Sequence, residues 1–327
     1  MAGTGAHSIG GLLRRVEVFA LPEVHIAELY VTTALTPDYR DAALCVRTRL
    51  VNEGSRREEN LSLRYQLWDP DGMSVALTPS STSLVPVDAA AKQTVDVAIP
   101  IDAPRMWDPE HPHLYTLEIE VVEGGTACYS VRQRVGFRQV EVHGEQVLVN
   151  GRPIKIRGIC DLGIHPTLGR AVPPEQCRRD AELLRDANIN LVRHHIAPPD
   201  EAFLDACDEL GVFVEVEHPF CWVGHVNGNA IWDHEDCQSL TYEPLILRGT
   251  VESVVQTRHH PCVLFWSLAN ESEWGPSFAK AMAYERQLDP TRPEAFTGGE
   301  TRMGTSIADD HYPGVTNVVR RDPDGRP

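Results

Sequence analysis

The sequence predicts a chain with two successive architectures: an antiparallel β-sandwich, and after it an α/β unit with a parallel sheet. From about residue 24 to residue 140, apolar and polar residues alternate in short runs, separated by turn signals such as "NEGS" and "DPDG". After "VNGRPI", strand-like runs alternate with amphipathic helical segments, which is typical of repeated βα units. A third observation is the apolar run in "FWSLANESEWG", which ends in Asn270 and Glu271.

The first part contains strands and no helical pattern. Short strands at this spacing indicate a β-sandwich, whose default role is structural. The expected strands are "HIAELYVTTAL", "AALCVRTRLV", "LSLRYQLWD", "TVDVAIPI", "LYTLEIEVV" and "YSVRQRVGF".

The second part alternates strands with helices. The helical segments are "PPEQCRRDAELLRDAN", "PDEAFLDACDELG", "LILRGTVESVVQTRHH" and "SFAKAMAYERQLD". Six strands are expected, around Ile156, Leu191, Val214, Phe265, Phe296 and Ile307, whereas a closed barrel needs eight. An open doubly wound sheet is the alternative, but no glycine-rich phosphate loop follows any strand.

Composition excludes some classes of partner and site. The 327 residues include 30 basic and 47 acidic ones, a net charge of -17 without a long basic run, which disfavours nucleic acid. No stretch approaches the roughly 20 apolar residues that span a bilayer, so no membrane is expected as a partner. The eight cysteines form no Cys-x-x-Cys pair and are expected to be reduced, mostly buried thiols. Reduced cysteines and the lack of a secretory signal at the start together predict a cytoplasmic protein.

Glu271 is the first candidate for catalysis. Barrel enzymes present catalytic groups at the carboxyl ends of buried strands, and Glu271 follows such a strand directly. The alternative is an ordinary strand exit, in which Asn270 turns the chain and Glu271 points into water.

Several long motifs resemble the family 2 glycoside hydrolases, which include β-galactosidases, β-glucuronidases and β-mannosidases. They are "SIGGLLRRVEVFALPEVHI", "MWDPEHPHLYTLEIEV", "VGFRQVEVHGEQVLVNGRPIKIRGI", "NINLVRHHIAPPDEAFLDACDELGVFVEVE" and "RHHPCVLFWSLANES", in the order of the family. The resemblance implies an immunoglobulin-like sandwich over residues 22–140 and the first part of a (β/α)8 TIM barrel over residues 141–327. Residues 1–21 are expected to be the remnant of an N-terminal jelly-roll domain and a linker.

The resemblance also implies a retaining hydrolysis of β-glycosidic bonds that uses two carboxylates. Glu271 matches the acid/base, which protonates the leaving oxygen and then activates water. Asn270 matches the asparagine that contacts the sugar 2-hydroxyl. The nucleophile of the family is a glutamate on strand seven, and we expect it to lie outside this chain, so that the chain on its own is inactive.

Some motifs of the family are altered here. A His-rich run is usual after strand one, but this chain has Leu162, Gly163 and Ile164 there. Of the run, only His165 is a histidine. Ile196 stands where a sugar-contacting histidine is expected. His194 or His195 could replace it, although adjacent strand residues face opposite ways and at most one can enter the site.

The other candidates come from strands two, three and six. Glu217 is expected either to contact sugar or to accept from Arg193. Trp222, with Trp274, could stack on a sugar or simply pack, and Tyr312 resembles an active-site tyrosine.

The chemistry of these positions also sets the expected partners. Cys221 and Val223 replace the residues that bind magnesium in some galactosidases, so we expect no metal and no cofactor. A carbohydrate is the expected partner, and unpaired strand edges could also support a homo-oligomer. The alternative function, suggested by the lost histidines, is noncatalytic carbohydrate binding or a scaffold role.

Overall fold

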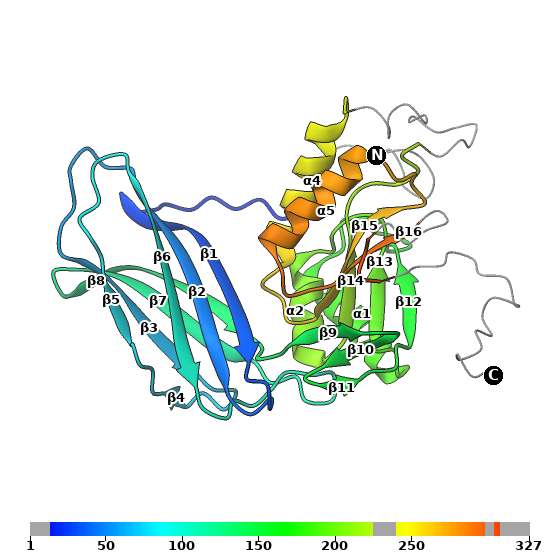
Figure 1. Cartoon of the computed structure of the whole chain (residues 1–327), viewed down its shortest axis with the longest axis horizontal. Helices are drawn as coiled ribbons and strands as arrows, with labels where there is room; N and C mark the ends of the chain where they lie inside the picture. The colour runs from blue at the N-terminus through cyan, green and yellow to red at the C-terminus, as the bar shows by residue number, and fades with distance from the viewer. Residues whose placement is uncertain (1–13, 225–239, 298–303, 308–327) are drawn as a thin grey trace, which may run out of the picture.

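The computed structural model describes residues 14–224, 240–297 and 304–307 of the chain. It consists of a β-sandwich, at the left in Figure 1, and an α/β part at the right. In the described residues no helix has the length and apolar character needed to cross a membrane.

The sandwich has two antiparallel sheets. One has three strands in the order β1-β2-β6. The other has five strands, in the order β4-β3-β7-β8 with β5 also paired to β3, and two facing antiparallel sheets are the architecture of immunoglobulin-like domains. The strands are β1 (Val24–Leu35), β2 (Ala42–Asn52), β3 (Leu61–Trp68), β4 (Ser74–Val75), β5 (Ser81–Ser83), β6 (Lys92–Ile101), β7 (Tyr115–Glu123) and β8 (Thr126–Val135).

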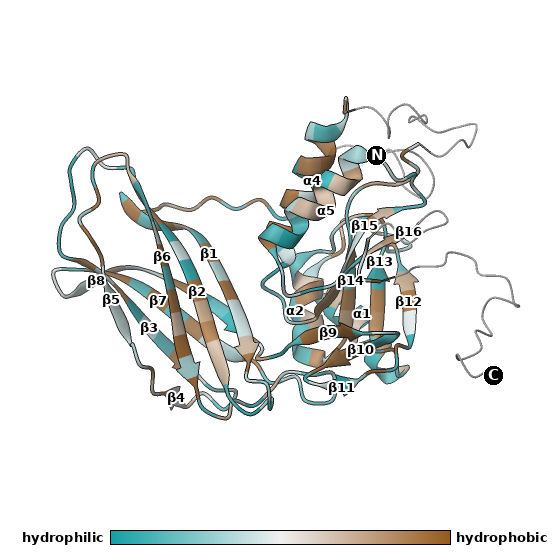
Figure 2. Cartoon of the chain, in the orientation of Figure 1, coloured by the Kyte–Doolittle hydropathy of each residue, from teal (hydrophilic) through white to brown (hydrophobic). Residues whose placement is uncertain are grey.

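The alternating sequence pattern explains why these strands form two facing sheets. In β3, Leu61, Leu63, Tyr65 and Leu67 are buried while the residues between them are partly exposed. Successive strand side chains point to opposite faces, so one face of each sheet enters the core and the other meets solvent. Figure 2 shows this as alternating brown and teal along the sandwich strands.

A small antiparallel sheet joins the two parts, and the sequence pattern did not predict it. Its order is β11-β10-β9, and its strands are β9 (Val140–His143), β10 (Gln146–Val149) and β11 (Arg152–Pro153). The hairpin of β9 and β10 turns at Gly144, which has a φ of +61°. Each strand is at most four residues long, too short for a recognisable alternation.

The α/β part contains a five-stranded parallel sheet of order β12-β13-β14-β15-β16. Every strand pairs with its neighbour in sequence, as in a barrel, whereas a doubly wound sheet reverses its order at a switch point. The strands are β12 (Gly158–Asp161), β13 (Leu191–His194), β14 (Phe213–Glu217), β15 (Val263–Asn270) and β16 (Glu294–Thr297). The helices are α1 (Pro174–Asp186), α2 (Glu201–Leu210), α4 (Glu243–Thr257) and α5 (Pro276–Leu288).

One of the six expected strands differs from expectation, and another lies mostly outside the described residues. The first begins at Gly158, and Ile156, around which it was predicted, precedes the strand and is 40% exposed. Of the sixth, "SIADDHY", only Ser306 and Ile307 are described, and the N–H of Ile307 donates to the carbonyl of Glu294 at 3.0 Å. The remainder of that predicted strand, with Tyr312, lies outside the described residues.

The seven described cysteines are all free. Four are buried, while Cys128 and Cys160 are exposed and Cys45 is intermediate. Burial raises the pKa of Cys177 to about 11, so this thiol is protonated at neutral pH.

Buried side chains join the sandwich to the α/β part. Trp107 donates from Nε1 to the carbonyl of Asp208 at 2.8 Å and packs edge-on against Phe213, with ring centroids 5.5 Å apart. Arg138 donates from Nη2 to the carbonyl of Val263 at 2.6 Å. The buried polar groups at this interface are thus hydrogen-bonded across it, and these bonds fix the sandwich against the α/β part.

Gly211 ends α2 in the left-handed conformation, with a φ of +74° and its N–H bonded to the carbonyl of Cys207. A Cβ here would lie 2.3 Å from the carbonyl oxygen of Pro109, in the sandwich-side segment. We expect Gly211→Ala to lower the free energy of unfolding by about 2–3 kcal/mol, through backbone strain and the clash together.

Urea denaturation of the purified chain measures this effect, with Gly72→Ala as the matched control. Gly72 has a φ of +80° but open space around its Cβ, so its replacement should cost only the strain, about 1 kcal/mol. Equal losses in the two variants would show that the approach of Pro109 does not matter.

Candidate active site

The candidate site lies at the carboxyl ends of neighbouring parallel strands. Glu217 is the last residue of β14, Asn270 is the last residue of β15, and His195 follows β13 directly. Because parallel strands end at the same edge of a sheet, residues more than 70 positions apart in sequence meet there.

Glu217 is the centre of the polar network. Its side chain is fully buried, and its Oε2 accepts from Nη2 of Arg193. Its Oε1 lies 2.8 Å from Nδ1 of His195, and Oγ of Ser267 lies 3.5 Å from Oε2. A buried carboxylate with this set of donors is rigidly held.

Arg193 connects this carboxylate to the asparagine. Its Nη2 also donates to Oδ1 of Asn270 at 2.9 Å, and its Nε lies 3.6 Å from a carboxylate oxygen of Glu215. Asn270 in turn donates from Nδ2 to Sγ of Cys221 at 3.2 Å. The amide of Asn270 is therefore fixed in orientation from both ends.

The loops after β14 and β15 run side by side and bring Trp222 next to Glu271. The N–H of Asn270 donates to the carbonyl of Phe220 at 2.9 Å, and the N–H of Trp222 donates to the carbonyl of Asn270 at 3.0 Å. Nε1 of Trp222 then donates to a carboxylate oxygen of Glu271.

Both partners of this last hydrogen bond have an unusual backbone. Glu271 has a φ of +40° and Trp222 a φ of +59°, a region that costs a residue with a side chain about 1–3 kcal/mol. Backbone strain of this kind persists only where the surroundings determine it, and it concentrates at functional sites. The two adjoining loops thus hold Glu271 at the mouth of the sheet.

The two adjacent histidines have different surroundings. His195 faces Glu217, whereas His194 is buried against Phe203, with its Nδ1 2.8 Å from the carbonyl of Ala197. Burial lowers the pKa of His194, which favours the neutral imidazole. Only His195 therefore belongs to the polar network.

The positions that depart from the family pattern are occupied by apolar or small residues. Ile196 is 1% exposed, so its side chain belongs to the core. Gly163 has a φ of +58°, and a Cβ there would lie 2.7 Å from Nε2 of His194. Leu162 and Ile164 line a cavity of about 580 Å³ between β12, α1 and the start of α2.

Trp274 packs edge-on against Phe296, with centroids 5.1 Å apart, as part of the core under α5. The sequence left open whether this residue stacks on a sugar or packs, and the structure shows the packing contact. Trp222 is the tryptophan whose indole reaches Glu271.

Three contact residues of the site were not recognised from the sequence as part of it: Ser267, Glu215 and Cys221. Glu215 could have been found, because it precedes Glu217 by two positions on the same face of the strand. Ser267 and Cys221 carried no such signal, since their partners lie about 50 residues away.

A buried pair lies behind the network. Nε2 of His218 is hydrogen-bonded to Oε2 of Glu285 on α5, and the His218 ring stacks on Trp266. Burial raises the pKa of Glu285. The hydrogen bond to Glu285 therefore anchors His218, which directly follows Glu217 in the chain.

One group in the described residues has the spacing of metal ligands, namely Asp205, Asp208 and His260, whose ligand atoms lie within 4.8 Å of one another. Asp208 accepts from His260 Nδ1 at 2.7 Å and from the N–H of Cys262 at 2.8 Å. Asp205 pairs with Arg134 of the sandwich. These contacts explain why the three residues lie close together: they belong to the interface between the sandwich and the α/β part.

Comparison with known proteins divides the chain at the same place as the structure does, between the sandwich and the α/β part. The family model described as "Glycosyl hydrolases family 2" matches residues 24–138, and that described as "Glycosyl hydrolases family 2, TIM barrel domain" matches residues 140–319.

Two curated relatives illustrate the similarity. A putative β-glucuronidase of Formosa agariphila is 32% identical over 321 residues, which cover 94% of this chain and 36% of that protein. A β-galactosidase of Alteromonas mediterranea is 27% identical over 326 residues, which cover 93% of this chain and 30% of that protein. The chain thus spans about a third of the length of these relatives.

Solved structures show the same architecture. The β-glucuronidase of Parabacteroides merdae has a TM-score of 0.70 at 25% identity, over 84% of this chain and 34% of that one. A glycosyl hydrolase family 2 member from Bacteroides cellulosilyticus shares the fold with a TM-score of 0.73 at 24% identity, over 86% of this chain and 38% of that one. The chain belongs to glycoside hydrolase family 2, with the immunoglobulin-like sandwich of the family followed by part of its TIM barrel.

Proposed function

We propose that this chain carries the acid/base side of a retaining β-glycosidase site, with Glu271 as the acid/base. The observation that carries the proposal is the position of Glu271 directly after β15, held by Trp222 and next to the anchored Asn270. The carbohydrate is a β-glycoside such as a β-galactoside or a β-glucuronide, the classes named by the relatives.

Glu271 has two successive tasks in this chemistry. A glycosidic oxygen leaves poorly until it is protonated, so the protonated carboxyl donates first. The resulting carboxylate then takes a proton from the water that releases the sugar. The indole N–H of Trp222 stabilises this carboxylate form and fixes its direction.

Asn270 is the candidate contact for the sugar 2-hydroxyl. Its Oδ1 accepts from Arg193 and retains a second lone pair for a sugar hydroxyl. Arg193 and His195 act as positioning residues, because they hold Asn270 and Glu217 in place.

Glu217 does not suit the role of nucleophile. It is fully buried, and its two oxygens already accept from Arg193 and His195. Glu215 likewise lies beside Arg193. We therefore propose that the nucleophile comes from a later strand of a longer protein, in keeping with the share of its relatives that this chain spans.

The stereochemistry of hydrolysis tests the proposed function. Proton NMR of the longer protein acting on 4-nitrophenyl β-glycosides should show the β-anomer as the first product, because two displacements retain the configuration. An α-anomer as first product, or no hydrolysis of any substrate in a panel of β-galactoside, β-glucuronide and β-mannoside, would refute it.

The 327-residue chain on its own is expected not to hydrolyse aryl β-glycosides at an enzymatic rate. General acid catalysis alone contributes about 10²–10⁴-fold, far below typical enzymatic acceleration. The measurement compares the purified chain with its Glu271→Ala variant on activated glycosides. Robust turnover that disappears in the variant would show that a nucleophile is present within these residues.

The altered histidine positions favour a second candidate function, noncatalytic carbohydrate binding. Ile196 is buried, and Gly163 leaves no room for a side chain beside His194. If this function is correct, the chain should bind free galactose or glucuronate with a change in tryptophan fluorescence that is absent in Trp222→Phe. No saturable change with either sugar would contradict it.

A further inference from the structure

A small cavity lies where the sandwich meets the α/β part, and its lining is rich in cationic side chains. Its volume is about 40 Å³. The sandwich side contributes Arg134 and Arg138, and the α/β side contributes Arg258, His259 and Arg292. No carboxylate is among the described residues that line it, although the chain as a whole has a net charge of -17.

Several nitrogen atoms of this lining lack a partner. Nε of Arg138, Nε of Arg258 and Nδ1 of His259 are buried and have no hydrogen-bond acceptor or donor among the described residues. Arg138 is 7% exposed, and its hydrogen bond goes to the neutral carbonyl of Val263. A buried donor left without an acceptor costs about 1–3 kcal/mol, and more when it is charged.

The neighbouring carboxylates are already committed to other partners. Asp289 pairs with Arg292 and accepts from Thr291 and Tyr30. Asp205 and Glu209 pair with Arg134. The guanidinium of Arg258 stacks on the Tyr30 ring at 4.0 Å and donates to the carbonyl of Leu288. Arg138 and Arg258 are therefore the two cations of the cavity without a carboxylate partner among the described residues.

The electrostatic environment agrees with this geometry. Burial and the nearby Arg292 lower the pKa of Arg138 to about 9, and burial and Arg258 lower the pKa of His259 to about 4. Both shifts mean that positive charge is disfavoured here in the absence of a compensating anion.

We propose that this cavity is a binding site for a small monatomic anion of the halide type, which bridges the sandwich and the barrel. Chloride is the physiological member of this class. A volume of about 40 Å³ holds a few water-sized particles, which suits a halide. The anion accepts from the guanidinium groups of Arg138 and Arg258, one from each part of the chain, and so contributes to the rigidity of their interface.

Thermal unfolding of the 327-residue chain tests the proposal at constant ionic strength. Replacing gluconate by up to 100 mM chloride or bromide should raise Tm by about 2–5 °C and then saturate, since the anion binds the folded state selectively. Identical Tm values in chloride and gluconate would overturn the proposal.

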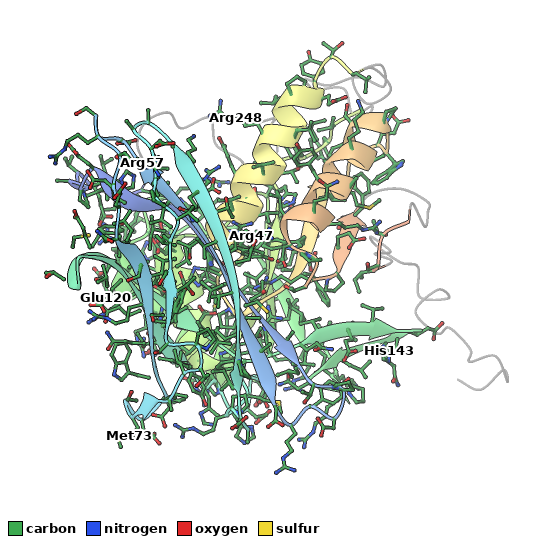
Figure 3. The ribbon with its side chains drawn as sticks, turned by 60° about the vertical axis from the view of Figure 1, so that its left-hand side comes forward. Arg47, Arg57, Met73, Glu120, His143 and Arg248 are labelled. Carbon is green, nitrogen blue, oxygen red and sulfur yellow. The ribbon has the colours of Figure 1, made fainter. Side chains whose placement is uncertain are left out.

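Two variants and a control locate the effect. Arg138→Gln and Arg258→Gln should each lose the chloride-dependent part of Tm, whatever their basal stability. Arg47→Gln should retain it, because Arg47 (labelled in Figure 3) is an exposed arginine on β2. Its partner is Asp96 of the sandwich. A chloride response that survives in both cavity variants would place the anion elsewhere and refute the site.

The unmodified protein provides a direct measurement if the variants do not fold. Crystals soaked in bromide should give an anomalous peak in the cavity, within hydrogen-bonding reach of both guanidinium groups. Electron density without anomalous signal would identify water there and refute the proposal.

Discussion

Replacing Glu271 by alanine in the longer enzyme is expected to slow the hydrolysis of glycosides with poor leaving groups by about 10²–10⁴-fold. Glycosides with good leaving groups, such as dinitrophenolates, need little protonation and should lose far less in the first step. Parallel kcat/KM measurements on alkyl and dinitrophenyl glycosides of the same sugar give this comparison. It isolates the acid role of Glu271, because the sugar and the rest of the site are unchanged.

Azide separates the base role from a structural one. In Glu271→Ala, azide should attack the glycosyl-enzyme in place of activated water, restore turnover and yield the β-glycosyl azide. Glu252→Ala, which removes an exposed carboxylate from α4, should behave as wild type with and without azide. Equal losses on both classes of leaving group, without rescue, would show that Glu271 is not the acid/base.

Replacing Trp107 by alanine is expected to lower the free energy of unfolding by about 3–5 kcal/mol. Trp107 is fully buried, comes from the segment between β6 and β7, and packs on Phe213 of the α/β part. Its loss removes apolar area and leaves a cavity at the interface. We also expect unfolding in urea, followed by circular dichroism and fluorescence, to divide into two transitions as the parts uncouple.

Two variants control this prediction. Trp107→Phe keeps a ring against Phe213 but loses the hydrogen bond from Nε1 to the carbonyl of Asp208, and should cost about 1–3 kcal/mol. Trp68→Ala removes a partly exposed tryptophan at the end of β3, away from Phe213. If Trp107→Ala were no more destabilising than Trp68→Ala, the interface would not depend on this side chain.

The sequence alone determined the architecture and the central candidate residue. Alternation in β3 and helical spacing in α1 are local properties, so they indicate secondary structure without knowledge of the tertiary fold. The position of Glu271 at a strand end was readable for the same reason, because the apolar run of β15 stops at Asn270. The short strands β9 to β11 were not predicted, since four residues carry too little periodicity.

Only the tertiary structure decided which partners these residues have. The hydrogen bonds from Arg193 to Glu217 and Asn270 join three strands, and that from Trp222 to Glu271 joins two loops 49 positions apart. The cationic cavity unites the end of β8 with the segments around Arg258 and Arg292 in the same way. Contacts of this kind depend on how the sheets and helices pack, and packing brings together side chains whose separation along the chain carries no periodic signal.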